Sequence, residues 1–321
     1  MTAAYDVVQV ASLGPAFDER LAANYRVLQA WRDPLGLAAS GKTLPGLRVA
    51  VTSVRHGFTR SMMDALPDLR AVCSWGVGYD TLDLRAAAER GIRVSVTPDV
   101  LDDCVADLAW ALLLSVARRT AVGDRYVKTG QWRALGQFPL ATRVSGKRLG
   151  ILGLGRIGEA IARRGAGFDM EVRYHNRRPR PQSPYGYEAS LEELAAWADF
   201  LVVACVGGAA TRHLVNAPVI RALGPQGILV NIARGSVVDQ AAALAALRSG
   251  ELGGAGLDVL EREPTDAAEF AGLDQVSLMP HVGSATRETR AAMADLVFDN
   301  VASFLRTGKL LTPVADREMR A

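Results

Sequence analysis

Residues 147–163 read KRLGILGLGRIGEAIAR, which is an apolar strand, a glycine-rich turn and an amphipathic helix in direct succession. A second strand is expected at residues 171–175, so the G-x-G-x-x-G string lies in the strand–turn–helix context of a dinucleotide site. Gly153 permits the tight turn, Gly155 lets the backbone approach a diphosphate, and Gly158 lets the helix pack on the strand. The positive N-terminal end of the helix would face the diphosphate.

The residues after the second strand favour NADP(H) as the cofactor. An NAD site carries an acidic residue about 20 positions on, to hold the ribose hydroxyls, but this chain has an asparagine followed by two arginines. Arginine binds a 2′-phosphate through paired charge-assisted hydrogen bonds, whereas a carboxylate would repel it. A solvated basic loop over residues 177–180 is the alternative interpretation. The cofactor contacts predicted from these two segments are Gly153, Leu154, Gly155, Arg156, Ile157, Gly158, Asn176, Arg177 and Arg178.

Length and composition indicate a globular protein of two domains. The chain has 321 residues, and domains contain roughly 100 to 200 residues each, so a cleft between two domains is expected. Hydrophobic residues make up 49% and charged residues 22% of the chain, as in ordinary globular proteins. The net charge is only +3 and the arginines are scattered, so we expect no nucleic-acid partner.

Targeting signals and cysteines point to the cytoplasm. The first twelve residues, MTAAYDVVQVAS, lack the basic region that opens a signal peptide. The longest apolar helical run, residues 108–117, is far shorter than the ~20 residues that span a bilayer, so no membrane partner is expected. Cys73, Cys104 and Cys205 are widely spaced in apolar segments, which favours reduced core thiols over disulfides or a metal site.

The order of predicted elements indicates an α/β fold with two doubly wound parallel sheets, because strands alternate with helices throughout. The first sheet is flavodoxin-like in a substrate-binding domain of residues 1–98 and 286–321, and the second is a Rossmann cofactor domain of residues 99–285. The first domain is discontinuous because a helix at about 285–301 is expected to cross back onto it. Strands are predicted at 6–10, 25–29, 48–53, 70–75 and 92–96, then at 148–152, 171–175, 200–205, 227–232, 254–259 and 276–279. The helices predicted in the first half lie at 58–66, 82–90 and 101–119.

Three polar residues follow strands of the second sheet, where ligands of open parallel sheets bind. Arg234, Glu263 and His281 supply a cation, a carboxylate and an acid, which together suit the reduction of a 2-oxo acid. Each also has an ordinary structural interpretation: a surface arginine, a solvated acidic loop, and a core or capping histidine. The residues alone leave both interpretations open.

The chain resembles the D-isomer specific 2-hydroxyacid dehydrogenases over essentially its whole length. Within that family it is most similar to the NADPH-preferring glyoxylate/hydroxypyruvate and hydroxyphenylpyruvate reductases. The motifs that carry the resemblance are GVGYD at 76–80, TPDVLDDCVADLA at 97–109, GLGRIG at 153–158, NIARG at 231–235, GAGLDVLEREP at 254–264 and MPHVGSAT at 279–286.

The resemblance implies a role for each residue of the site. His281 would donate the proton, Glu263 would hydrogen-bond and charge it, and Arg234 would bind the substrate carboxylate and polarise the carbonyl. Backbone N–H groups of Val77 and Gly78 would hold the same carboxylate. Further cofactor contacts would come from Cys205, Thr211, Ile232, Ala233, Arg234, Asp258, His281 and Gly283, with Asp258 at the nicotinamide carboxamide. Family members also form homodimers through the cofactor domain.

Some features depart from the family pattern or stay open. Residues 206–208 read Val-Gly-Gly where many relatives have Pro-Leu-Thr, close to the predicted adenosine side. Residues 130–140 shape the pocket in relatives, and Arg55 and His56 either touch substrate or form a solvated loop. The expected partner is a small 2-oxo or 2-hydroxy acid. A nucleotide-sensing corepressor on the same fold is the alternative function, and formate dehydrogenase-like chemistry is disfavoured because such relatives have glutamine in place of Glu263.

Overall fold

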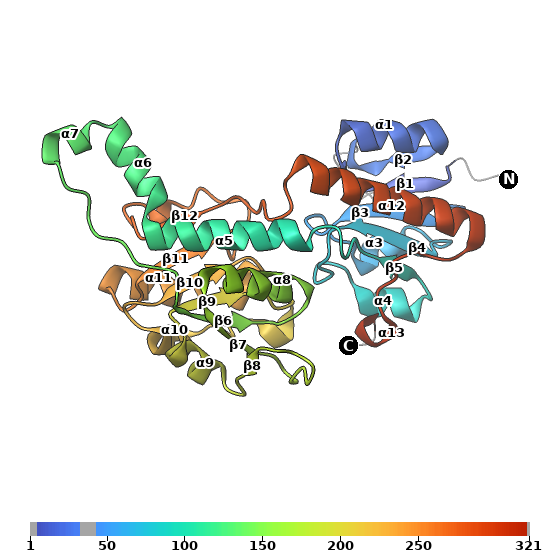
Figure 1. The fold of residues 1–321 in the computed structure, drawn as a ribbon. Coiled ribbons are helices and arrows are strands. Elements are labelled where there is room, and N and C mark those ends of the chain that lie inside the picture. Colours follow the sequence, from blue (N-terminus) through green and yellow to red (C-terminus); the bar gives the residue numbers. More distant parts are fainter. Residues whose placement is uncertain (1–4, 33–42, 320–321) are drawn as a thin grey trace. The chain divides into compact units, whose positions relative to one another are not determined.

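The computed structural model describes residues 5–32 and 43–319, and the chain divides into two compact units. Unit 1 comprises Met1–Leu101 with Thr286–Ala321, and unit 2 comprises Asp102–Ala285. The boundaries expected from the sequence were 98/99 and 285/286. Each unit is built on its own parallel sheet (Figure 1).

Unit 1 contains a five-stranded parallel sheet in the order β2-β1-β3-β4-β5. This is the flavodoxin-like strand order, so the predicted fold class of this unit is confirmed. Each strand is shorter than the sequence pattern suggested, because its outermost residues enter the turns. The strands are β1 Val7–Gln9, β2 Val27–Gln29, β3 Val49–Ser53, β4 Ala71–Trp75 and β5 Arg93–Ser95.

Helices cover both faces of the unit 1 sheet (Figure 1). Helices α1 (Pro15–Asn24) and α12 (Arg287–Thr307) pack on one face, and α3 (Arg60–Asp64) and α4 (Leu84–Glu89) pack on the other. The late helix therefore returns to the first sheet, as predicted. It runs six residues past the expected end at 301, and it stops where Gly308 adopts a left-handed conformation. The short elements η1 (Ala30–Arg32) and α13 (Asp316–Met319) complete the unit.

Unit 2 contains a seven-stranded parallel sheet in the order β12-β11-β10-β9-β6-β7-β8. Strands β6 and β9 are neighbours, so the chain changes direction across the sheet at that point, which is the Rossmann arrangement and confirms the prediction. The strands are β6 Arg148–Leu152, β7 Glu171–His175, β8 Gly186–Tyr187, β9 Phe200–Val203, β10 Ile228–Asn231, β11 Gly254–Leu257 and β12 Val276–Leu278.

The unit 2 sheet is likewise covered on both faces. Helix α5 (Asp102–Arg118) lies so close to β11 that a Cβ on Gly256 would come within 2.9 Å of the Leu112 side chain. The Trp110 indole of α5 donates to the carbonyl of Ile161 in α8 (Arg156–Gly165), 3.1 Å away, so these two helices share a face. The opposite face packs against α9 (Leu191–Trp197), α10 (Ala217–Leu223) and α11 (Gln240–Ser249). The short helices η2 Ala166–Phe168, η3 Ala209–Thr211, η4 Gly235–Val237 and η5 Ala268–Phe270 lie in the connecting loops.

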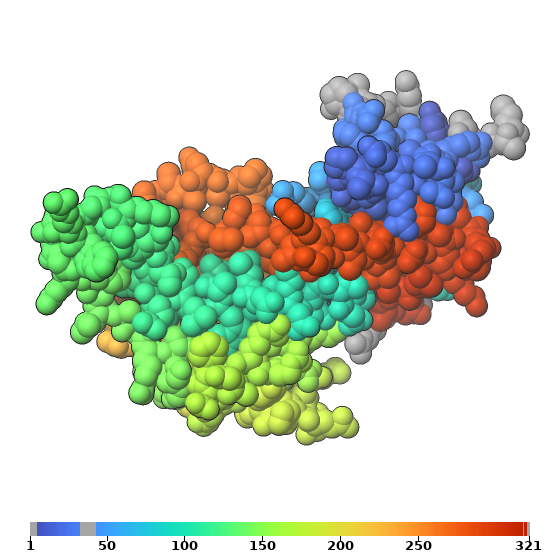
Figure 2. All heavy atoms as spheres, turned by 45° about the horizontal axis from the view of Figure 1, so that its top comes forward, coloured from blue at the N-terminus to red at the C-terminus, as the bar shows by residue number. Residues whose placement is uncertain are grey.

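Helices α6 (Thr120–Lys128) and α7 (Gln131–Leu135) form an arm at the margin of unit 2, drawn in green in Figures 1 and 2. Neither helix contains a buried residue. The arm and the segment after it expose large apolar side chains: Val127 at 54%, Trp132 at 61%, Leu135 at 70% and Leu140 at 98%. The sequence had marked residues 130–140 only as a pocket-shaping segment.

The three cysteines form no disulfide. Cys73 is buried, as predicted for a core thiol, but Cys104 and Cys205 are only half-buried. Within residues 5–32 and 43–319, no helix is both long enough and apolar enough to cross a bilayer.

Candidate active site

Three glycines mark the passage from β6 into α8, two in the turn and Gly158 in the first turn of the helix, and each is required for a different structural reason. Gly153 has φ +100°, and a Cβ there would lie 2.5 Å from the backbone nitrogen of Cys205. A Cβ on Gly158 would lie 2.2 Å from the Gly153 carbonyl oxygen, so helix and turn pack too closely for any side chain. A Cβ on Gly155 would meet no heavy atom within 4 Å. Gly155 thus borders the open space where a diphosphate is expected.

Helix α8 leaves its N-terminal amides uncapped by any side chain. The helices α9, α10 and α11 each begin with a side chain that accepts from the third residue on, namely Ser190, Asn216 and Asp239. Helix α8 begins with Gly155, which has no such group. Its first N–H groups therefore present partial positive charge. The turn accordingly fits an anionic diphosphate.

The basic segment after β7 divides into two parts. The Asn176 side-chain oxygen accepts from the Leu154 N–H at 2.8 Å, and Arg180 donates to the Leu154 carbonyl and pairs with Glu159, both at 3.0 Å. These two residues hold the glycine turn in place. Arg177 and Arg178 are exposed, and with the rest of the described chain they form neither a hydrogen bond nor an ion pair. Their guanidinium groups remain available for a phosphate.

The loop after β9 is closed by Thr211. Its hydroxyl donates to the carbonyls of Val206 at 2.8 Å and Gly208 at 3.1 Å, and the residue is 8% exposed. Burial raises the pKa of the Cys205 thiol to about 11, so this thiol is not ionised near neutral pH. The cofactor contacts expected of both residues stay predictions.

Asn231, the last residue of β10, shapes the loop that carries Arg234. Its side chain accepts from the Ala233 N–H at 3.0 Å and donates to the Arg234 carbonyl at 2.9 Å. The Arg234 guanidinium is half-buried and donates to the Ala233 carbonyl at 2.7 Å. No role was predicted for Asn231, although a polar residue that ends the apolar run ILVN is a signal visible in the sequence.

His281 and Glu263 form a direct pair across 18 positions of sequence. The His281 Nδ1 lies 2.6 Å from Glu263 Oε2, and Glu263 Oε1 accepts from the Leu260 N–H at 2.8 Å. The two side chains are 34% and 27% exposed. Because Nδ1 is engaged by the carboxylate, Nε2 is the ring nitrogen left for a substrate.

Asp258 ties the His281 loop to β11. The residue is 2% exposed, and its two carboxylate oxygens accept from the Val282 N–H at 2.7 Å and the Gly283 N–H at 2.9 Å. Its carbonyl accepts from the His281 N–H at 2.8 Å. Burial raises the pKa of this carboxyl. A contact to the nicotinamide carboxamide, predicted by resemblance, would use its remaining lone pairs.

Comparison with known proteins agrees with this geometry. Residues 110–283 match the family model described as D-isomer specific 2-hydroxyacid dehydrogenase, NAD binding domain. This chain belongs to the D-isomer specific 2-hydroxyacid dehydrogenase family. The predicted membership is therefore confirmed.

Relatives of this 2-hydroxyacid dehydrogenase match it over nearly its full length. It is 44% identical over 311 residues to hydroxyphenylpyruvate reductase of Plectranthus scutellarioides, across 97% of this chain and 99% of that protein. It is 42% identical over 308 residues to glyoxylate/hydroxypyruvate reductase A of Arabidopsis thaliana, across 96% and 98%. Among solved structures, it is similar to the NADPH-dependent glyoxylate/hydroxypyruvate reductase of Sinorhizobium meliloti in complex with NADP and malonate, with 40% identity, 97% of each chain covered and a TM-score of 0.91.

A second loop contact supports Glu263 in the dehydrogenase. The Glu261 side chain contacts His213 Nε2, and the Glu261 N–H donates to the Gln240 side chain at 3.0 Å. A Cβ on Gly235 would lie 2.0 Å from the Leu260 carbonyl, so the Arg234 turn and the Glu263 loop are in close contact. His213 and Gln240 were not predicted from the sequence, because neither lies near Glu263 in the chain.

In unit 1 of the dehydrogenase, the predicted carboxylate loop follows β4. Gly76 has φ +138°, its N–H donates to the Thr97 hydroxyl at 3.1 Å, and its carbonyl accepts from the Thr97 N–H at 2.8 Å. Thr97 is 1% exposed. Through these two hydrogen bonds it fixes both the N–H and the carbonyl of Gly76, the residue directly before Val77 and Gly78. His56, in the loop after β3, contacts the Ser53 hydroxyl at 2.8 Å through Nδ1.

Proposed function

We propose that this dehydrogenase reduces a small 2-oxo acid to the D-2-hydroxy acid with NADPH. Glyoxylate and hydroxypyruvate are the leading substrates and hydroxyphenylpyruvate is a bulkier candidate. The observation that carries the proposal is the His281–Glu263 pair at 2.6 Å, adjoining the turn of Arg234. This set provides a proton donor, a carboxylate that orients it, and a cation for the substrate.

NADPH supplies the hydride to the carbonyl carbon when it is bound. His281 then transfers a proton from Nε2 to the carbonyl oxygen, so the carbonyl gains one hydride and one proton and becomes an alcohol. Glu263 holds Nδ1, which fixes the ring orientation and stabilises the positive ring before transfer. Arg234 neutralises the substrate carboxylate and polarises the carbonyl, with the backbone N–H groups of Val77 and Gly78 as further donors.

The choice of NADPH is supported by Arg177 and Arg178 and by the NADP-bound relative of 40% identity. We propose that the diphosphate lies over Gly155 at the N-terminus of α8. The contacts farther along the chain are proposed to be Cys205, Thr211, Ile232, Ala233, Asp258 and Gly283.

We also propose a homodimer formed through the cofactor domain. The apolar side chains exposed on the α6–α7 arm and on the segment after it support this proposal, because Trp132, Leu135 and Leu140 would otherwise face water. A cytoplasmic location and the lack of a nucleic-acid partner remain proposals from sequence. The corepressor alternative finds no support among the relatives named above, which are all reductases.

The test is the loss of NADPH absorbance on adding glyoxylate, hydroxypyruvate, phenylpyruvate or hydroxyphenylpyruvate separately. We expect turnover with at least one of these acids, and His281→Ala should abolish it while leaving NADPH binding measurable by fluorescence. Folded enzyme that binds NADPH but reduces none of the four acids would refute the proposed substrate class.

A further inference from the structure

Three arginines lie side by side at the N-terminal edge of the unit 1 sheet. Arg48 directly precedes β3, Arg70 precedes β4, and Arg93 is the first residue of β5. Their backbones are linked in a ladder, since the Arg70 N–H donates to the Arg48 carbonyl and the Arg93 N–H donates to the Arg70 carbonyl, both at 2.9 Å. Neighbouring strands are about 4.8 Å apart, so three guanidinium groups arise from a narrow strip of surface.

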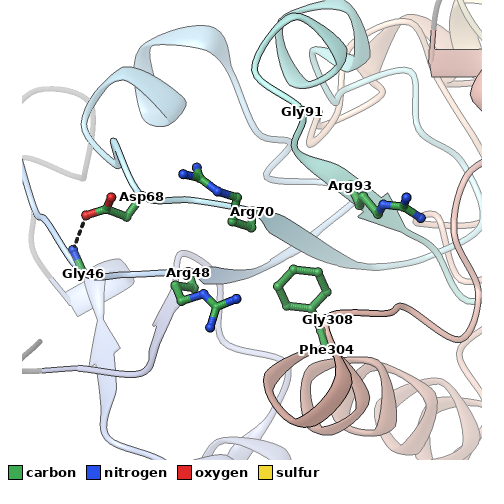
Figure 3. Close-up of a pocket in the computed structure, with 8 residues that line it drawn as sticks. All are labelled: Gly46, Arg48, Asp68, Arg70, Gly91, Arg93, Phe304 and Gly308. Atoms are coloured by element: carbon green, nitrogen blue, oxygen red, sulfur yellow. Dashed lines mark hydrogen bonds between the residues drawn. The ribbon is translucent and has the colours of Figure 1, made fainter.

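These arginines are among the residues that line a cavity of about 440 Å³ (Figure 3). Figure 3 shows the Phe304 ring, from α12, between Arg48 and Arg93. Phe304 forms an apolar wall, and three glycines leave the rim free of side chains. The complete lining is Gly46, Arg48, Asp68, Arg70, Gly91, Arg93, Phe304 and Gly308.

The cavity has an excess of positive charge, with three guanidinium groups against one carboxylate. The carboxylate, Asp68, accepts from the Gly46 N–H at 2.7 Å. Arg70 donates to a neighbouring carbonyl at 2.9 Å. The side chains of Arg48 and Arg93 make no hydrogen bond or ion pair with any residue in the described ranges 5–32 and 43–319.

These three arginines lack the carboxylate partner that several other arginines of the same unit have. Arg26 pairs with Asp6 at 2.6 Å, and Arg60 pairs with Glu89 at 2.6 Å. Guanidinium groups held near one another repel. The single carboxylate of the cavity offsets only part of that repulsion, and an anion that binds between the arginines removes more of it.

We propose that this cavity binds a small anion that carries two or more phosphate or carboxylate groups. Guanidinium groups bind both kinds of oxyanion through paired hydrogen bonds. Two anionic groups allow one ligand to engage arginines on separate strands, and the volume suits a small molecule. The apolar wall of Phe304 would contact the carbon or bridging part of the ligand.

This site is separate from the proposed carboxylate loop of the same unit. Arg70 and Gly76 stand at opposite ends of β4, Ala71–Trp75. At about 3.3 Å per residue, the two ends are roughly 20 Å apart. A substrate held at Val77 and Gly78 therefore cannot also occupy the arginine cavity, and the inference does not rest on the proposed function.

The experiment is calorimetric titration of the full-length protein with inorganic diphosphate and, separately, with citrate. NADP⁺ is kept saturating so that the arginines of the cofactor turn are occupied. We expect the wild type to bind at least one of the two anions, and Arg48→Gln/Arg93→Gln to weaken that binding at least tenfold. Tighter binding of diphosphate would identify phosphate groups as the ligand, and tighter binding of citrate would identify carboxylates.

The matched control is Arg118→Gln/Arg143→Gln, which removes two exposed arginines of unit 2 and the same net charge. It should bind the anion as the wild type does. Arg48→Lys/Arg93→Lys keeps the positive charge but loses the paired hydrogen bonds of the guanidinium group. Anion binding should therefore weaken in this variant too, which keeps the test available if the Gln variant fails to fold. Affinities unchanged in the cavity variants, or lowered equally in the control, would overturn the proposal.

Discussion

Replacing Arg177 and Arg178 together by Ala should remove the preference for NADPH over NADH. Both side chains are exposed and have no partner among the described residues, so their loss leaves the turn intact. A charge-assisted hydrogen bond contributes roughly 1.5 to 3 kcal/mol, and 1.4 kcal/mol corresponds to about a factor of ten. Even one such contact at the lower limit predicts that wild-type kcat/KM favours NADPH by at least about tenfold.

The structure supplies a matched control in Arg180, two positions further on. Arg180 donates to the Leu154 carbonyl and pairs with Glu159, each at 3.0 Å, so it supports the turn itself. Arg180→Ala should therefore lower kcat/KM for NADPH and NADH to a similar extent, with the preference retained. The double variant should lower kcat/KM for NADPH alone.

The assay is steady-state kinetics with each cofactor varied at a saturating 2-oxo acid. Equal kcat/KM for NADPH and NADH in the wild type would refute the assignment of Arg177 and Arg178. A double variant that keeps the full preference would refute it as well, because no 2′-phosphate contact would then depend on these side chains.

Glu263→Gln keeps a hydrogen-bonding group but removes the negative charge beside His281. In steady-state assays, kcat should therefore fall at least about tenfold while KM for NADPH stays unchanged. An unaltered kcat would show that Glu263 does not act in the site. Asn231→Ala removes the side-chain hydrogen bonds to the Ala233 N–H and the Arg234 carbonyl, so it should raise KM for the 2-oxo acid more than KM for NADPH. Equal changes in the two KM values would contradict a positioning role for Asn231. Burial raises the pKa of Cys73 to about 12 from 9.0, so the stability due to its neutral thiol is present below pH 9 and is lost as pH rises towards 12. A shift of one pKa unit corresponds to about 1.4 kcal/mol. Between pH 8 and 10.5, the free energy of unfolding measured in urea should therefore fall by roughly 2 kcal/mol more in the wild type than in Cys73→Ala. An equal fall in the two proteins would contradict this prediction.

The Gln131–Leu135 helix and its neighbours show where sequence patterns gave too little information. The arm has no buried residue, and no helix was predicted over residues 120–135. Strand β8 contains only two residues, too few for an alternating pattern. The return of α12 to the first sheet was predictable, because its apolar positions had no strand of their own to cover.

The sequence by itself determined the two-sheet α/β fold, the family, the glycine turn and the residue types of the site. These depend on local spacing: apolar runs set the strands, and each turn needs its own small or polar residues. Only the tertiary structure decided how the side chains are used. It separated Arg180, which supports the turn, from Arg177 and Arg178, and it brought His213 and Gln240 to the loop that carries Glu263. Such pairings depend on hydrogen bonds between chain-distant groups, and parallel strands bring those groups together only when the sheet has formed.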